Sequence, residues 1–170
     1  MSLKNAIARV DHAAVLPSSI IENTAAAGFY CSKQIITEED KKAVYNATNG
    51  AAKALREAIN VKIALKDIYI EPVTMEKTDA NGNPVYATNE SGEPILDEFG
   101  EPLVKTDIAP RIVLFDADGT TYGCVSNGVY NSLKKLCNLM GTPDTWEKPI
   151  TIIPKLVSNG KNQVLTFNLG

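Results

Sequence analysis

A β-hairpin followed directly by an amphipathic helix is the feature that most constrains how this chain folds. Residues 111–115 are an apolar run typical of a buried strand, and Asp116-Ala117-Asp118-Gly119 has the composition of a tight turn. Residues 120–126 predict a second strand, which completes the hairpin. A helix is then predicted over residues 128–140, because its apolar residues fall on one face.

Further strands are predicted on both sides of this unit. Residues 61–73 alternate apolar and polar side chains, and a register shift near Asp67 indicates a β-bulge that bends the strand. After the helix, residues 150–156 predict a strand that Pro154 interrupts, and residues 165–169 alternate again. Three strands, one helix and two strands is the order of the five-stranded oligonucleotide-binding (OB) barrel. We therefore predict a mainly β fold with an OB-like barrel whose helix lies between the third and fourth strands.

The barrel is expected to span residues 61–170, with residues 1–60 as an N-terminal extension. Within the extension, Thr37-Glu38-Glu39-Asp40 has the form of a helix-capping box, whereas residues 42–48 alternate as a strand does. The alanine-rich residues 51–59 favour a helix. The extension is therefore expected to contain one strand and one short helix.

A long acidic insertion, residues 74–108, follows the first predicted strand of the barrel. It contains three G-x-P turns, each followed by an apolar residue. Residues 75–107 hold eight acidic side chains against Lys77 and Lys105, a net charge of −6, so the rest of the chain carries +3 of its total of −3. A loop of this length is usually functional or mobile.

Composition argues against several classes of protein. Cys31, Cys124 and Cys137 are far apart and odd in number, so neither a disulfide framework nor a zinc site is predicted. His12 is the only histidine, which removes most histidine-dependent catalysis. No apolar run approaches the ~20 residues of a membrane span, and residues 1–9 are too broken by charge for a secretory signal. We expect a cytoplasmic chain with no metal, no other cofactor and no membrane partner.

Residues 112–120 nearly match the nucleophile motif of haloacid-dehalogenase-like phosphatases. In that family one aspartate is the nucleophile and a second the acid/base, which would be Asp116 and Asp118, with a magnesium ion between them. That family places the motif near the start of a parallel sheet, whereas only 50 residues follow Thr120 here. A hairpin turn is therefore the favoured interpretation, and a metal-dependent phosphatase is kept as the alternative.

Two stretches resemble the single-stranded DNA-binding proteins of small tailed bacteriophages that prime their DNA replication with a protein. Residues 44–50 lead into the first predicted strand, and residues 115–122 match the pattern F-x-A-D-G-[ST]-x-Y of those proteins. The resemblance covers residues 42–73 and 109–170. It implies a protein that is not an enzyme and that coats displaced single strands during phage replication, without sequence preference, in the host cytoplasm.

The resemblance and the predicted barrel together select the candidate DNA contacts. Binding of single strands without sequence preference needs cations for the phosphates and aromatic faces for the bases. In an OB barrel the binding groove crosses the second and third strands and is flanked by loops. The candidate nucleic-acid-binding residues are Tyr45, Lys53, Arg56, Lys62, Lys66, Tyr69, Arg111, Phe115, Tyr122 and Lys161. Phe115 ends an apolar run, so a core position competes with stacking for that ring.

Single-stranded DNA is thus the expected partner. We hypothesise that the acidic insertion is a flexible arm that either contacts a neighbouring protomer or competes with DNA for the basic groove. Self-association through the N-terminal extension is a further interpretation. A virion or scaffold protein with a small barrel is the remaining alternative to a DNA-binding protein or a phosphatase.

Overall fold

The structure is a computed structural model, and it describes residues 29–170. Two compact units make up this part and are described separately. Residues 29–72 and 110–170 form the body, and residues 73–109 form the arm. Predictions for residues 1–28, His12 among them, lie outside the described residues. Among the helices of the described part, none is long and apolar enough to cross a membrane.

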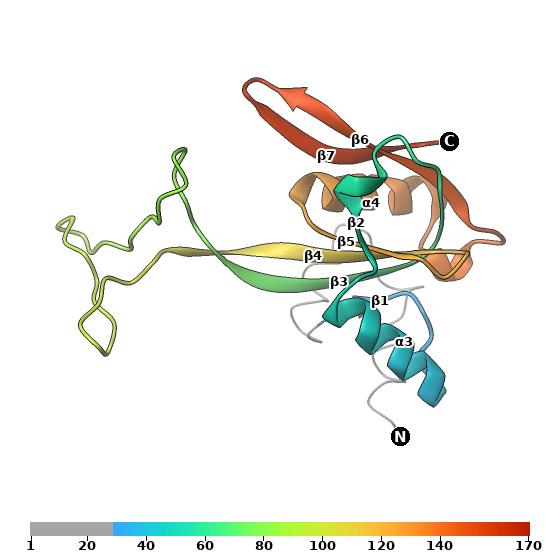
Figure 1. Cartoon of the computed structure of the whole chain (residues 1–170), viewed down its shortest axis with the longest axis horizontal. Coiled ribbons are helices and arrows are strands. Elements are labelled where there is room, and N and C mark those ends of the chain that lie inside the picture. The colour runs from blue at the N-terminus through green and yellow to red at the C-terminus, as the bar shows by residue number, and fades with distance from the viewer. Residues whose placement is uncertain (1–28) are drawn as a thin grey trace. The chain divides into compact units, whose positions relative to one another are not determined.

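The body is mainly β, and its sheet curls into half a barrel (Figure 1). The strands are β1 (Tyr30–Cys31), β2 (Lys53–Ala54), β3 (Ile63–Glu76), β4 (Thr106–Asp116), β5 (Thr121–Val125), β6 (Ile150–Asn159) and β7 (Asn162–Leu169). Their order across the sheet is β2-β5-β4-β3-β6-β7, and β1 pairs with β3. β2 runs parallel to β5, whereas the β1–β3, β3–β6, β4–β5 and β6–β7 ladders are antiparallel.

Two helices cover opposite faces of the sheet, α3 (Glu38–Asn49) and α4 (Asn127–Met140) (Figure 1). Leu114 shares a core cluster with Leu133 of α4. The next residue along β4, Phe115, shares a second cluster with Val44 of α3. Because successive side chains of a strand point to opposite faces, each face of β4 is buried under a different helix.

The predicted hairpin and helix are confirmed. The Asp116–Gly119 turn joins β4 to β5, and Gly119 has φ 94°, a region that favours glycine. α4 begins after Ser126, whose hydroxyl accepts a hydrogen bond from the Val129 N–H at 3.1 Å.

The register shift near Asp67 is present as well. Ile63 and Leu65 lie in the same core cluster as Ile68 and Ile70. In a regular strand Leu65 and Ile68 would face opposite sides, so an extra residue between them restores the burial of Ile68. β3 therefore keeps one apolar face on the core from Ile63 to Ile70.

The strand predicted over residues 42–48 is wrong, because these residues belong to α3. The capping box is formed: the Thr37 hydroxyl accepts from the Asp40 N–H at 3.1 Å, and the Asp40 carboxylate accepts from the Thr37 N–H at 3.0 Å. Val44 and Ala47, three positions apart, both bury against the sheet, as one face of a helix requires. Capping and packing together outweigh the short alternation.

The helix predicted over residues 51–59 is also wrong. Lys53 and Ala54 form β2 and pair with β5, and a 3₁₀ turn, η2 (Leu55–Ala58), follows. Leu55 and Ala58 are buried in the core, so tertiary packing overrides the helix propensity of the alanines. The described residues of the predicted extension thus belong to the same compact unit as the strands.

β6 continues through Pro154, which the sequence predicted to interrupt it. The β3–β6 ladder covers only Ile150 to Ile152, so β3 takes no hydrogen bond from position 154. The Pro154 carbonyl accepts a hydrogen bond from the Asn60 N–H at 2.8 Å. A second 3₁₀ turn, η3 (Pro143–Thr145), connects α4 to β6.

The arm contains three turns of one geometry. Their glycines have φ of 82°, 80° and 80° at Gly82, Gly92 and Gly100. A side-chain oxygen near the start of each turn accepts two backbone N–H bonds from the same turn, and the acceptors are Asp79, Asn89 and Asp97. Because every one of these bonds is local, the residue pattern of each turn is enough to specify it.

Candidate nucleic-acid interface

Five of the six predicted cations are exposed on the body and form no ion pair with another described residue. They are Lys53, Arg56, Lys62, Lys66 and Lys161. The sixth, Arg111, lies 3.3 Å from a Glu71 oxygen, measured from its Nη1. An exposed ammonium or guanidinium without a carboxylate partner is free to replace the counterions of a phosphate backbone.

Three of the four predicted rings are buried. Tyr122 lies in the core under α4, and Phe115 lies between the sheet and α3. Tyr69 stacks on Phe29 with 5.4 Å between ring centroids, and its hydroxyl donates to a Glu71 oxygen at 2.9 Å. Helices cover both faces of the sheet, so in this arrangement none of the three offers a face on which a base could stack.

Tyr45 is the predicted ring that is exposed, with 67% of its surface accessible. It lies on α3, on the side of the helix away from the buried Val44 and Ala47. Ala43, Asn46 and Ala47, which lie on the other side of the helix, line a cavity between α3 and the β4–β5 turn, and Tyr45 is not among the lining residues.

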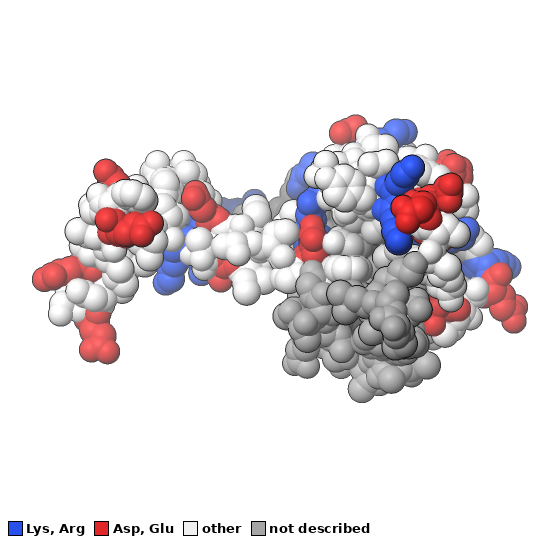
Figure 2. All heavy atoms as spheres, turned by 90° about the horizontal axis from the view of Figure 1, so that it is seen from below, with Lys and Arg blue, Asp and Glu red and all other residues white. Residues whose placement is uncertain are grey.

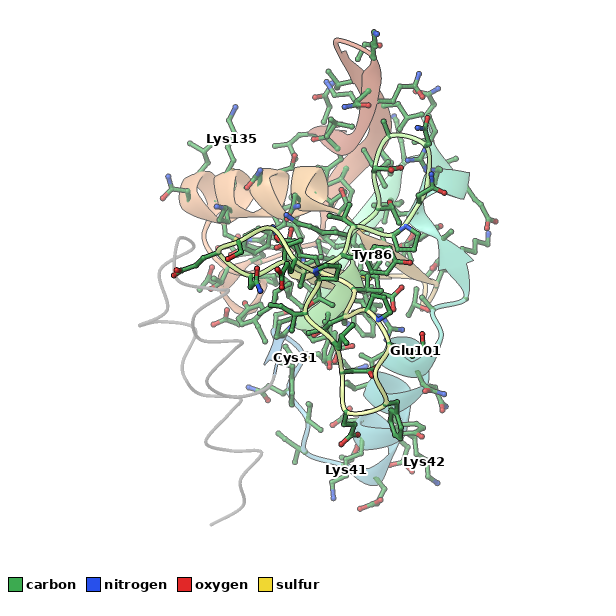
Figure 3. The ribbon with its side chains drawn as sticks, turned by 90° about the vertical axis from the view of Figure 1, so that its left-hand side faces the viewer. Cys31, Lys41, Lys42, Tyr86, Glu101 and Lys135 are labelled. Carbon is green, nitrogen blue, oxygen red and sulfur yellow. The ribbon has the colours of Figure 1, made fainter. Side chains whose placement is uncertain are left out.

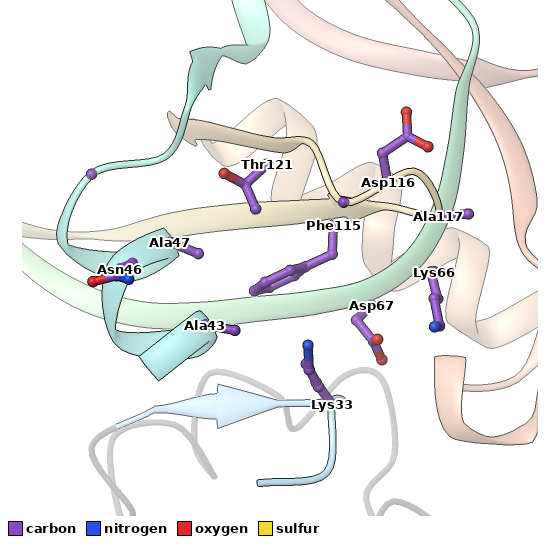
Figure 4. Close-up of a pocket in the computed structure, with 12 residues that line it drawn as sticks. Lys33, Ala43, Asn46, Ala47, Lys66, Asp67, Phe115, Asp116, Ala117 and Thr121 are labelled. Atoms are coloured by element: carbon purple, nitrogen blue, oxygen red, sulfur yellow. The ribbon is translucent and has the colours of Figure 1, made fainter. Parts of the chain in front are cut away.

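This cavity measures about 410 Å³ and brings two predicted residues together, Phe115 and Lys66 (Figure 4). Lys33 also lines it and points toward the Phe115 ring, with 5.8 Å from Nζ to the ring centroid, which is a cation–π distance. Asp67 and Asp116 contribute carboxylates. The cavity is thus polar, with charges of both signs around one aromatic ring.

Lys33 was missed by the sequence analysis. It reaches the cavity because β1 pairs with β3, with Cys31 opposite Tyr69, and this pairing carries the following residues along. No periodicity or motif near residue 33 predicts that pairing, so no local signal could have found Lys33.

Asp67 is a partly buried carboxylic acid that lines the cavity. Burial raises the pKa of its carboxyl above the usual range, although the Ser32 hydroxyl donates to Oδ1 at 2.9 Å and Lys66 and Lys33 act in the opposite direction. When the pKa of an acid is higher in the folded than in the unfolded protein, the protein loses stability as the pH rises from the unfolded-state pKa through the folded-state pKa. Ionised Asp67 therefore destabilises the fold at neutral pH.

Replacing Asp67 with asparagine is expected to raise the melting temperature at neutral pH, because the amide oxygen still accepts from Ser32 while the buried charge is gone. The advantage should shrink as the pH falls toward about 4, where the wild-type carboxyl is increasingly protonated. Thermal unfolding across this pH range measures it, and an unchanged difference would contradict the assignment.

A second hollow, of about 530 Å³, lies between β5, the start of α4 and β7. Arg56 and Gln163 line it, and none of the described residues that line it is acidic. Lys53 does not line it and lies opposite Tyr122 in the β2–β5 register. Of the other predicted residues, Lys62 and Lys161 line neither hollow.

Asp116 and Asp118 are engaged in the turn that the sequence favoured. Asp116 Oδ1 accepts the Asp118 N–H at 3.2 Å, and Asp118 Oδ1 accepts the Thr120 N–H at 2.8 Å, which lowers the pKa of the Asp118 carboxyl. β4 and β5 are antiparallel neighbours, whereas the phosphatase motif belongs to a parallel sheet. Within residues 29–170 no three His, Cys, Asp or Glu side chains group as metal ligands.

The cysteines behave as core residues. Cys31 and Cys137 are buried, and Cys124 is half-buried. Burial raises the pKa of the Cys31 and Cys124 thiols to about 12 and that of Cys137 to about 11. The reactive thiolate is therefore scarce at neutral pH.

Comparisons of the chain with protein-family models, with curated proteins and with solved structures find no match.

Proposed function

We propose that this chain is a sequence-nonspecific single-stranded DNA-binding protein, built on an OB-like body, that coats displaced strands during phage DNA replication. The observation that carries the proposal is the set of five exposed cations without ion-pair partners in the described part of the body. The chain outside the arm has a net charge of +3, while the acidic surplus is confined to the arm. Such a separation of charge favours phosphate binding at the body.

The arrangement of the sheet supports the OB-like part of the proposal. β3, β4 and β5 precede α4, and β6 and β7 follow it, which is the element order of that barrel. Apart from the two-residue β2, the path across the sheet ends with β5 on one side and β7 on the other. The OB barrel is itself partly open, and the hollow that Arg56 lines lies between these two strands.

Each contact type needed for a single strand has a candidate among the exposed residues. Arg56, at the hollow between β5 and β7, and Lys53, exposed on β2, would neutralise phosphates and release their counterions. Tyr45, exposed on α3, would supply the stacking face. Neither contact reads the identity of a base, so binding would be indifferent to sequence.

The test is a titration of a fluorescent oligonucleotide and of the matching duplex. Tight, salt-dependent binding to the single strand and weak binding to the duplex are expected. Replacing Tyr45 with alanine should weaken single-strand binding at least about fivefold, the lower end of what one stacked base contributes.

Tyr45→Phe is the matched control, because it removes only the hydroxyl and keeps the ring. It should bind like the wild type. Unchanged binding by Tyr45→Ala would remove Tyr45 from the interface, and equal losses in both variants would assign the contact to the hydroxyl rather than to a stacked ring. No preference of the wild type for the single strand would overturn the proposed function.

A further inference from the structure

The third turn of the arm carries a feature that the other two lack. The three turns share one geometry, and the residue before the glycine is Asn81 in the first, Ser91 in the second and Phe99 in the third. Phe99 is 81% exposed. Acidic Glu98 adjoins it, so the tip of this turn presents an aromatic ring in a negative surround. Figure 2 shows several acidic side chains on the arm.

A groove on the body, called here the α4–β7 groove, is apolar and carries positive rather than negative charge. It is a hollow of about 300 Å³ between α4 and the β6–β7 hairpin. Leu139, Val157 and Leu169 line it, and Leu139 is 71% exposed. Lys135 and Lys155 line it as well, and the side chain of Lys135 points away from α4 (Figure 3). No acidic residue is among the described residues that line it.

We propose that the Phe99 turn of one copy of this chain docks in the α4–β7 groove of a second copy. The ring would cover Leu139, Val157 and Leu169, and burial of one aromatic side chain in such a hollow is the usual anchor of a protein interface.

Charge complementarity selects a second copy as the occupant. The arm carries a net charge of −6, and the groove is lined by two lysines and no described acid. Glu98 and Glu101 flank Phe99 and are placed to meet Lys135 and Lys155 as the ring enters. Arm and groove are different surfaces, so the contact is head-to-tail and each copy can both give an arm and receive one.

Head-to-tail contacts suit a protein that binds neighbouring sites along a strand, but the docking itself needs no DNA. It can therefore be tested on the full chain alone, and its failure would leave the proposed DNA binding untouched. The measurement is sedimentation velocity over a range of protein concentrations at low salt. The average mass of the wild-type species is expected to rise with protein concentration, and the assemblies are expected to dissociate when salt is added.

Phe99→Ser gives the third turn the residue that the second turn has at the equivalent position, Ser91. The local geometry of the third turn is therefore retained. This variant should associate about 10- to 100-fold more weakly, as expected for losing one buried aromatic side chain. Leu139→Glu, in the groove, should have the same effect. Asn81→Ser changes the equivalent position of the first turn and should associate like the wild type.

A mixture of the two defective variants gives the sharpest result. Phe99→Ser retains an intact groove, and Leu139→Glu retains an intact arm, so together they should form a one-to-one complex that grows no further. A wild type that stays monomeric at all concentrations would overturn the proposal. An arm that docks within its own chain or on another protein would give this result. Equal behaviour of Phe99→Ser and Asn81→Ser, or a mixture that does not associate, would overturn it too.

Discussion

Replacing Lys53, Arg56 and Lys66 together with glutamine is expected to weaken binding to single-stranded DNA about 100-fold near 0.1 M salt, since each lost phosphate contact is worth roughly fivefold there. All three side chains are exposed and form no ion pair within the described residues, so their loss should leave the fold intact. The slope of log affinity against log salt should fall by about 2, because each single-strand phosphate contact contributes about 0.7.

The matched control removes three positive charges elsewhere on the body. Lys134, Lys135 and Lys148 line neither hollow of the candidate interface and are not on α3, so changing them to glutamine alters the net charge equally. This control should keep most of the affinity and of the salt slope. If both triple variants lose affinity equally, net charge rather than a defined surface attracts the DNA, and the proposed interface is wrong.

Gly128→Ala is expected to destabilise the fold by about 2 kcal/mol or more, although alanine in a helix is worth about 1 kcal/mol over glycine. Gly128 lies in the first turn of α4 against β7, where a Cβ would collide with the Leu165 carbonyl oxygen and with Val164 Cγ1. A backbone oxygen in a paired strand cannot move aside cheaply, so the collision outweighs the gain in helix propensity.

Thermal unfolding measures this, and the melting temperature should fall by about 4–8 °C in a chain of this size. Gly50→Ala is the control: φ is −179°, which any residue adopts, and among the described residues nothing lies within 4 Å of the added Cβ. A melting temperature of Gly128→Ala equal to or above that of Gly50→Ala would show that α4 does not pack on β7 as described.

Elements whose bonds are local were predictable from the sequence. The Asp116–Gly119 turn, α4 and the three turns of the arm each depend on residues within a few positions of one another. The order of strands around α4 also followed from local alternation, since each strand carries its own apolar face. The exposure of the lysines and arginines was predictable as well, because these residues are rarely buried without a partner.

The N-terminal half of the body shows where local patterns fail. Residues 42–48 alternate well enough for a strand, and the same residues place Val44 and Ala47 on one face of a helix. The sequence is compatible with a strand and with a helix, and the choice between them depends on a sheet face that is formed by distant residues. Lys33 reaches its cavity by the same kind of contact, through β1 on β3.

By itself, then, the sequence determined the turns, the order of the strands around α4, the amphipathic α4 and the acidity of the arm, because neighbouring residues specify each of them. Only the tertiary structure decided that Tyr69 and Phe115 are covered on one face of the sheet and Tyr122 on the other. An aromatic ring gains by burial and by stacking on a base alike, so its residue type cannot distinguish the two. Packing of α3 and α4 on opposite faces of the sheet makes that choice, and it leaves Tyr45 exposed.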